Sequence, residues 1–317
     1  MSRQIVFKRV APIPEQSGMA VVSKFVSENG TGLFLYVESD SSKKVTETFE
    51  SGIGIFPRSR MSDAKKFTLV MLSNGAQEVL ELPPLRVTFP LIDVFPDGRV
   101  LVSGSRSQWR GADDFDLNGL VIDPSACSER SFLLGDGIES SAVDSCGRIW
   151  VSYFDEGIFG NFGWGHPGPK PIGSPGLNCF SHTGSLIWSF PVQSEIEPIS
   201  DCYAMNVSGE SVAVYAYTEF DLCRISPDLK IETFTTGLKG CHHFAITDTK
   251  VMFTGQYDDD ISVGYTGELA DGRLRDIKAV EFVQMDGAKI KAGQFVGRGD
   301  TLHFFDDQNW YSTQVDS

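Results

Sequence analysis

A hairpin pattern that recurs along the chain constrains the fold of this sequence more than any other feature. The clearest copies are residues 92–103 and 142–153, where two apolar strands flank a turn that contains glycine. Glycine and aspartate supply tight turns, and apolar side chains at every second position are typical of strands. Weaker copies follow the same pattern at residues 205–215, 244–253, 295–305 and, most degenerate, 22–37.

The spacing of these copies predicts the architecture. They recur roughly every 40–60 residues, which leaves room for two further strands in each repeat, as in the blades of a propeller. One blade cannot bury both of its faces alone, so neighbouring blades must stack. The six copies predict an all-β, six-bladed β-propeller in which residues 1–317 form one domain. The last copy lacks an outer strand, and we expect residues 4–10 to supply it and close the ring; a seventh blade within residues 51–83 is the alternative.

Composition and charge narrow the class further. With 32 glycines and 23 phenylalanines in 317 residues, the chain favours β structure with frequent turns. Its formal net charge of −15 repels phosphate backbones, so we expect no nucleic-acid partner. No apolar run reaches the roughly 18–20 residues of a membrane span, and residues 1–9 lack a signal-peptide core. Six scattered cysteines without a CxxC pair fit free thiols. We expect a cytoplasmic monomer without membrane contact.

Polar residues stand near the innermost strand of several repeats, where propeller loops meet over the central channel. They are Asp93, Glu139, Asp201, Tyr203, His242, His243 and Gln294. Oxygen ligands from separate blades suit Ca²⁺ or Mg²⁺, so Glu139 and Asp201 are the predicted metal ligands. Histidine suits acid–base work near neutral pH, and His243 and Glu139 are predicted to be catalytic. Asp93, Tyr203 and Gln294 are predicted to contact a ligand; alternatively, each polar residue satisfies a local backbone group.

Arginine interrupts a second, acidic series that follows the second strand of several repeats. Residues 105–110 bring Arg106 and Arg110 to the position that residues 155–156 fill with Asp and Glu in the next repeat. Such an arginine is predicted to bind a substrate carboxylate or to stabilise an oxyanion, with Trp109 beside it. The alternative is a structural ion pair with Asp113 or Asp114.

A loop rich in glycine and proline occupies residues 157–175, between the second and third strands of the third repeat. Such loops lie on the surface and often cover pockets. Its aromatic residues Phe159, Phe162 and Trp164 predict an ordered lid, with Trp164 in contact with the ligand. A decorative insertion is the alternative.

The hairpin copies resemble the superfamily of NHL-like, streptogramin-lyase-like and gluconolactonase-like propellers, and residues 135–157 are also similar to bacterial propellers of unassigned function. Gluconolactonase-like enzymes hold a divalent metal in the channel through Glu, Asn and Asp, but their ligand spacing has no clean copy here. Streptogramin-type lyases use a channel histidine and a metal; His243 matches that residue type, without a flanking motif.

Two hypotheses of function follow from these features. The first is a propeller that binds a small molecule or a protein partner at the acidic channel face, because no complete catalytic motif is present. Phosphate-binding glycine loops and the GxSxG elbow are both missing from the sequence. The second is a hydrolase or lyase assisted by Ca²⁺ or Mg²⁺, which uses the channel carboxylates and His243.

Overall fold

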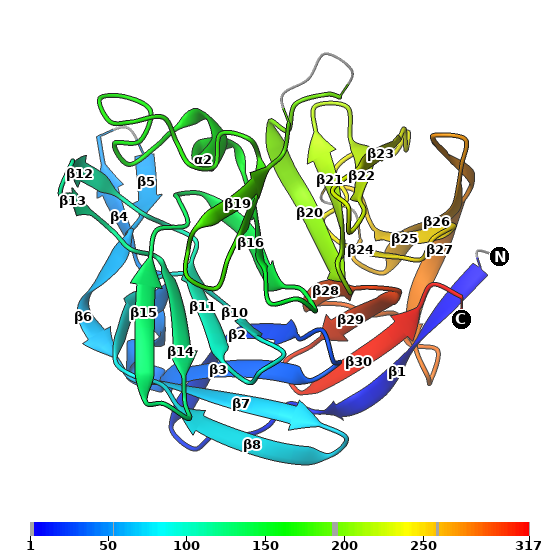
Figure 1. The fold of residues 1–317 in the computed structure, drawn as a ribbon. Helices are drawn as coiled ribbons and strands as arrows, with labels where there is room; N and C mark the ends of the chain where they lie inside the picture. The colour runs from blue at the N-terminus through cyan, green and yellow to red at the C-terminus, as the bar shows by residue number, and fades with distance from the viewer. Residues whose placement is uncertain (1–2, 53, 192–195, 258–259, 317) are drawn as a thin grey trace. The chain divides into compact units, whose positions relative to one another are not determined.

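Four-stranded antiparallel sheets, in which strands follow one another in sequence order, dominate the structure (Figure 1). The computed structural model describes residues 3–52, 54–191, 196–257 and 260–316. The chain divides into two compact units, Pro14–Val192 and Met1–Ile13 with Gln193–Ser317. The repeated sheets confirm the predicted all-β propeller fold. No helix in these ranges is long and apolar enough to cross a membrane.

Three sheets form the unit Pro14–Val192. The first contains β2 (Met19–Val26), β3 (Gly32–Glu38), β7 (Phe67–Ser73) and β8 (Ala76–Glu81). The second contains β10 (Pro90–Val94), β11 (Val100–Gly104), β14 (Gly119–Asp123) and β15 (Ser128–Phe132). The third contains β16 (Ile138–Val143), β17 (Ile149–Tyr153), β18 (Leu177–Phe180) and β19 (Leu186–Ser189). Each predicted hairpin in this region forms the first two strands of one sheet.

Short elements join these sheets and decorate them. Two-stranded ribbons are formed by β4 (Thr48–Ser51) with β5 (Gly54–Pro57), β6 (Arg60–Lys65) with β9 (Leu85–Val87), and β12 (Trp109–Gly111) with β13 (Asp114–Phe115). The helices are η1 (Ser39–Ser41), α1 (Ser42–Val45) and α2 (Asp155–Phe159). Residues 51–83 therefore supply β7 and β8 to the first sheet, and their described part forms no separate four-stranded blade.

The second unit contains one sheet of four strands and one of eight. The smaller consists of β20 (Asp201–Ser208), β21 (Ser211–Tyr217), β22 (Asp221–Ile225) and β23 (Ile231–Phe234). The larger runs in the order β24 (Phe244–Ile246), β25 (Lys250–Thr254), β26 (Val263–Ala270), β27 (Arg273–Gln284), β1 (Arg3–Pro12), β30 (Asn309–Gln314), β29 (Thr301–Phe305) and β28 (Gln294–Arg298).

The N-terminal strand β1 joins the two halves of the eight-stranded sheet. Its second half pairs antiparallel with β30, which confirms that it supplies the outer strand of the last repeat. Its first half pairs in parallel with β27 of the preceding repeat, a contact that the sequence did not predict. Phe7 anchors the strand, because its buried ring packs 5.4 Å from that of Phe282 and 6.1 Å from that of Phe304. The number of blades and the closure of the ring stay predictions.

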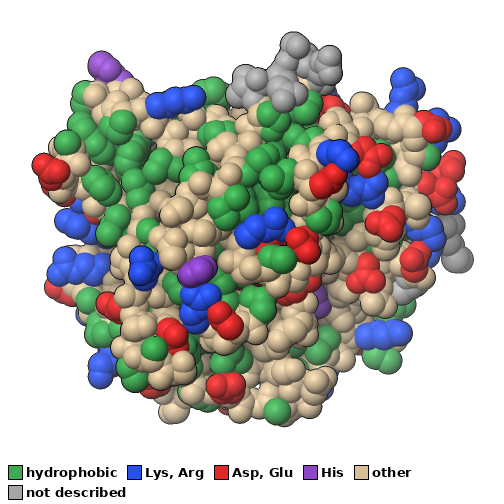
Figure 2. Space-filling view, viewed as in Figure 1, with side chains coloured by type: hydrophobic (Ala, Val, Ile, Leu, Met, Phe, Trp, Pro, Cys, Tyr) green, Lys and Arg blue, Asp and Glu red, His purple; other side chains and the backbone are tan. Residues whose placement is uncertain are grey.

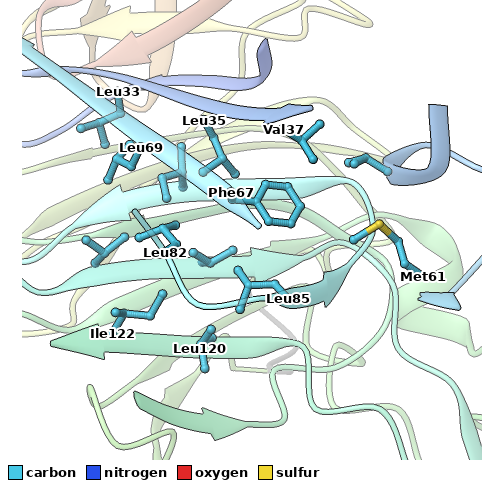
Figure 3. Packing of buried hydrophobic residues seen from close by; sticks show 14 residues of the cluster. Leu33, Leu35, Val37, Met61, Phe67, Leu69, Leu82, Leu85, Leu120 and Ile122 are labelled. Atoms are coloured by element: carbon cyan, nitrogen blue, oxygen red, sulfur yellow. The ribbon is translucent and has the colours of Figure 1, made fainter. Parts of the chain in front are cut away.

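Alternating apolar residues form the core between the first two sheets (Figure 3). Leu33, Leu35 and Val37 project from β3, and Leu120 and Ile122 project from β14. Successive side chains of a strand point to opposite faces. Apolar residues at every second position therefore put one face of each strand in the core. Met61 of β6 and Leu85 of β9 also belong to this cluster, and they attach the β6–β9 ribbon to the core.

Candidate functional site

Asp93 lies within a strand, and its predicted contact with a ligand stays a prediction. It is the fourth residue of β10, and Pro90 begins the strand as Ile138 begins β16. The side chain is fully buried. Its Oδ1 accepts the Val94 N–H at 2.8 Å, and its Oδ2 accepts the Val143 N–H at 2.8 Å. We therefore assign Asp93 the role of tying β10 to β16.

Asp201, Tyr203 and Gln294 lie where the sequence predicted, at the beginnings of inner strands. Asp201 and Gln294 are the first residues of β20 and β28. The ring of Tyr203 stacks on that of His242, with 5.0 Å between centroids and an angle of 26° between planes. Tyr203 also meets the edge of Phe220 at 5.0 Å. Tyr203, His242 and Phe220 thus form an aromatic cluster within one unit, and the ligand contacts of Tyr203 and Gln294 stay predictions.

His243 directly precedes β24 and is held through its backbone. Its carbonyl oxygen accepts the Thr254 N–H at 2.9 Å, and its ring lies 6.2 Å from that of Phe295. Burial, with a smaller effect from His242, lowers the pKa of His243 to about 4. The imidazole is therefore neutral at pH 7 and is a weak proton acceptor there, and its catalytic role stays a prediction.

The predicted metal ligands come from both compact units. Glu139 is exposed on β16 of one unit, whereas Asp201 and His243 belong to the other. Their convergence over a channel, and with it the metal-assisted chemistry, stays a prediction. In the described ranges, no group of three or more His, Cys, Asp or Glu side chains is arranged to hold a metal ion.

Arg106 is buried within a cage of acidic and aromatic side chains. Its Nη1 lies 2.6 Å from Oε2 of Glu156, and its Nη2 lies 3.1 Å from Oδ2 of Asp136. The guanidinium carbon also lies 4.5 Å from the ring centre of Phe162 and 5.3 Å from that of Phe154. Only 4% of the side chain is exposed. Arg106 thus forms a structural ion pair with Asp136 and Glu156, whereas the predicted pair with Asp114 is formed by Arg110, whose Nε lies 3.0 Å from Oδ1 of Asp114. The role of Arg106 toward a ligand stays a prediction.

The carboxyl group of Asp136 is held in an unfavourable environment. Its Oδ1 accepts the Ser107 N–H at 2.8 Å, but its buried Oδ2 lacks a hydrogen bond despite its proximity to Arg106. Burial raises the pKa of Asp136 to about 6, against the opposing charge of Arg106. This residue should therefore leave a signature in the pH dependence of stability.

Replacing Asp136 by asparagine should remove that signature. An unfolded aspartate has a pKa of about 3.9, so between pH 4 and 6 the folded wild type binds more protons than the unfolded chain. Its free energy of unfolding then falls as pH rises, and the Asp136→Asn variant should gain about 2 kcal/mol relative to wild type from pH 4 to 7. Urea unfolding across this range measures the difference, with the exposed Asp113→Asn as control. A constant difference between wild type and Asp136→Asn would contradict the raised pKa.

The loop of residues 157–175 lies between β17 and β18, as predicted, and packs on the second sheet's connections. Phe162 accepts the Trp109 N–H through its carbonyl oxygen at 2.9 Å. Trp164 is buried, and its Nε1 donates to the carbonyl oxygen of Ser107 at 2.9 Å. Phe159 is exposed. Phe162 and Trp164 therefore fasten the loop, while ligand contacts of Trp109 and Trp164 stay predictions.

Two adjoining cavities lie beside this loop, within the unit Pro14–Val192. The larger has a volume of about 460 Å³ and the smaller about 360 Å³, and Ser59, Arg60 and Arg86 line both. Four arginines line the larger one, which we call the arginine cavity: Arg58, Arg60, Arg86 and Arg110. Asp and Glu are absent from its described lining. Phe162 of the loop forms part of the same wall.

A buried carboxylate orients two of these arginines. Oδ1 of Asp116 lies 2.6 Å from Nη2 of Arg110 and 3.1 Å from Nη1 of Arg60. Burial acts to raise the pKa of Asp116, but hydrogen bonds from Arg110 and Ser59 outweigh it and lower the pKa below its ordinary value. Asp116 therefore stays ionised and fixes two guanidinium groups in place before any ligand arrives.

Strand pairing brings Arg60 and Arg86 together. Arg60 pairs with Val87 in the β6–β9 ribbon, so Arg60 and Arg86 come together although they are distant in sequence. Their neighbours Met61 and Leu85 are buried in the core cluster, and alternation along each strand directs Arg60 and Arg86 the opposite way. Arg58 forms an ion pair with Glu47 at 2.9 Å, whereas Arg86 has no ion-pair partner among the described residues.

Sequence reasoning missed Arg58, Arg60, Arg86 and Asp116. The signal it had was Arg58-Ser59-Arg60, two arginines in the long irregular segment of an acidic chain. Figure 2 shows acidic and basic side chains interspersed on the displayed face, so net charge alone does not locate a site there.

No protein-family model matches the sequence, and no curated protein matches it. Virginiamycin B lyase from Staphylococcus aureus has a similar fold, with 12% identity over 98% of this chain and 100% of that chain at a TM-score of 0.49. Regucalcin, a calcium-binding protein from Agrobacterium tumefaciens str. C58, matches with 12% identity over 98% and 95% at a TM-score of 0.45. Hsv2 from Kluyveromyces lactis matches with 7% identity over 94% and 75% at a TM-score of 0.50. These likenesses concern the fold alone.

Proposed function

We propose that this propeller binds a small anionic molecule in the arginine cavity. The observation that carries the proposal is the lining of that cavity, which holds four guanidinium groups and, in its described part, no carboxylate. In a chain with a net charge of −15, such a concentration of arginine is unexpected from composition alone. Guanidinium forks match the oxygen pairs of carboxylate and phosphate groups.

The arrangement supports binding because its charges are fixed in advance. Asp116 holds Arg60 and Arg110, and the core anchors the strands that carry Arg60 and Arg86. A ligand anion then meets oriented donors and orders fewer side chains on binding, which reduces the entropic cost. Arg86, which lacks an ion-pair partner among the described residues, offers the least neutralised charge.

Calorimetry with inorganic phosphate, pyrophosphate and citrate at low ionic strength tests this proposal. We expect binding that weakens as salt is added, because partly exposed charges are screened. Arg86→Gln should weaken the affinity about tenfold or more, the loss expected for one charge-assisted hydrogen bond. Arg275→Gln is the matched control, because it removes the same charge from an exposed pair with Asp271 in the other unit. Absence of binding by all three anions, or equal affinities for both variants, would refute the proposal.

A further inference from the structure

The two cavities differ in the chemistry of their walls. Arginine dominates the larger one, whereas six apolar side chains line the smaller one: Pro84, Leu85, Val87, Phe115, Leu117 and Leu120. Arg60 and Arg86 belong to both linings, so the cationic wall continues directly into the apolar one. A ligand that is held by these two arginines therefore has apolar surface next to it.

Leu117 shows that the apolar wall is held in place. About 51% of this leucine is exposed, although both of its neighbours are buried. Asp116 is bound by Arg60 and Arg110, and Asn118 donates to the carbonyl oxygens of Gly104 at 2.8 Å and Gly135 at 2.6 Å. The backbone on both sides of Leu117 is therefore fixed, and the side chain cannot turn into the core without breaking these contacts.

The remaining charges of the smaller cavity argue against a second anionic group there. Glu129 lines it with a carboxylate, and the guanidinium of Arg106 is already paired with Asp136 and Glu156. Apart from Arg60 and Arg86, which the two cavities share, an anion placed in the smaller cavity would meet the carboxylates of Glu129 and Asp116 and a neutralised Arg106, so it would gain little. An apolar group would instead cover Leu117 and its neighbours and remove them from water.

We propose that the ligand is an amphipathic anion, with one carboxylate or phosphate head group in the arginine cavity and an apolar body in the smaller cavity. This inference rests on the proposed function and names the class of its ligand. The volumes of the two cavities lie within or near the range of small-molecule sites, about 300–1,000 Å³. A carboxylate and a phosphate head group would make the same contacts with the arginines. The apolar body is therefore what distinguishes this ligand from a free anion.

A homologous series of straight-chain carboxylates, from acetate to octanoate, and the matching alkyl phosphates test the inference by calorimetry on the full chain. Each added methylene should strengthen binding up to about fourfold until the smaller cavity is filled, after which the affinity levels off. Octanol, which has the same apolar body without the charge, should bind much more weakly than octanoate.

Variants separate the two ends of the ligand. Leu117→Asn should flatten the gain with chain length and leave the affinity for acetate and inorganic phosphate unchanged. Leu186→Asn is the matched control, because it is 57% exposed on β19 and lines neither cavity. Arg86→Gln should weaken every member of the series by a similar factor.

The possible outcomes distinguish the inference from the proposed function. If short anions bind but longer chains bind no tighter, the amphipathic ligand is refuted and the anion site stands. If octanol binds as tightly as octanoate, or Leu186→Asn flattens the series as much as Leu117→Asn does, the inference is refuted as well. If no anion of either series binds and inorganic phosphate also fails, the proposed function itself falls.

Discussion

Replacing Asp144 by alanine is expected to lower the free energy of unfolding by roughly 3–4 kcal/mol. The side chain is fully buried at the turn between β16 and β17. Its Oδ1 accepts the N–H groups of Cys146 and Arg148, both at 2.9 Å. Its Oδ2 accepts Nε of Arg148 at 2.6 Å and Nε1 of Trp150 at 2.9 Å. Alanine would leave the fully buried Trp150 donor without this acceptor, and a buried unsatisfied group costs about 1–3 kcal/mol by itself.

Urea unfolding of the wild type and three variants measures this effect. Asp97→Ala is the control, since Asp97 binds Arg99 in the corresponding hairpin between β10 and β11 but is exposed. We expect the control to lose less than about 1 kcal/mol, as exposed ion pairs contribute little. The loss of stability in Asp144→Asn should lie between the losses in the two alanine variants, because the asparagine amide keeps an acceptor oxygen but carries no charge. Equal losses for Asp144→Ala and Asp97→Ala would contradict the role of burial.

Gly137→Ala is expected to release residues 155–175, a segment that contains α2 and the loop of residues 157–175, from its position. Gly137 adopts φ +65°, which disfavours a side chain, and its Cβ would lie 2.3 Å from the backbone nitrogen of Gly157. Backbone cannot yield as a flexible side chain does, so the segment that begins at α2 must move. The Phe154 N–H bond to the carbonyl oxygen of Gly137, at 2.9 Å, would be lost with it. We expect a destabilisation of about 3 kcal/mol or more, beyond the roughly 1–2 kcal/mol of left-handed backbone alone.

Gly98→Ala is the control that measures only the cost of a left-handed backbone. Gly98 has φ +88°, but a Cβ there would meet no atom within 4 Å. Hydrogen exchange of the amides in residues 155–175 should rise in Gly137→Ala and not in Gly98→Ala. Since Phe162 forms part of the arginine cavity, Gly137→Ala should also weaken anion binding. Unchanged exchange in this loop would contradict the close approach of Gly137 and Gly157.

The candidate site shows why sequence reasoning reached some residues and missed others. Arg106 was identified because it interrupts a repeated acidic position, yet its partners Asp136 and Glu156 lie in another repeat and carry no mark of the pairing. Asp93 was grouped with candidate ligand contacts because it is polar, although its buried carboxylate accepts the Val143 N–H of the neighbouring sheet. The position of a residue within a repeat predicts which strand it belongs to. The burial of its side chain and the partners that the side chain contacts depend on the neighbouring sheet.

The sequence by itself determined the hairpins, the all-β fold, the outer position of β1 and the site of the long loop. These features follow from alternation and turn residues, which act over a few residues of chain. Only the tertiary structure decided that Arg58, Arg60, Arg86 and Arg110 line one cavity. They come from the connection between β5 and β6, from two strands paired across a long separation, and from the β12–β13 ribbon, with buried Asp116 between two of them. Such convergence is set by packing and long-range pairing, which no spacing within one repeat encodes.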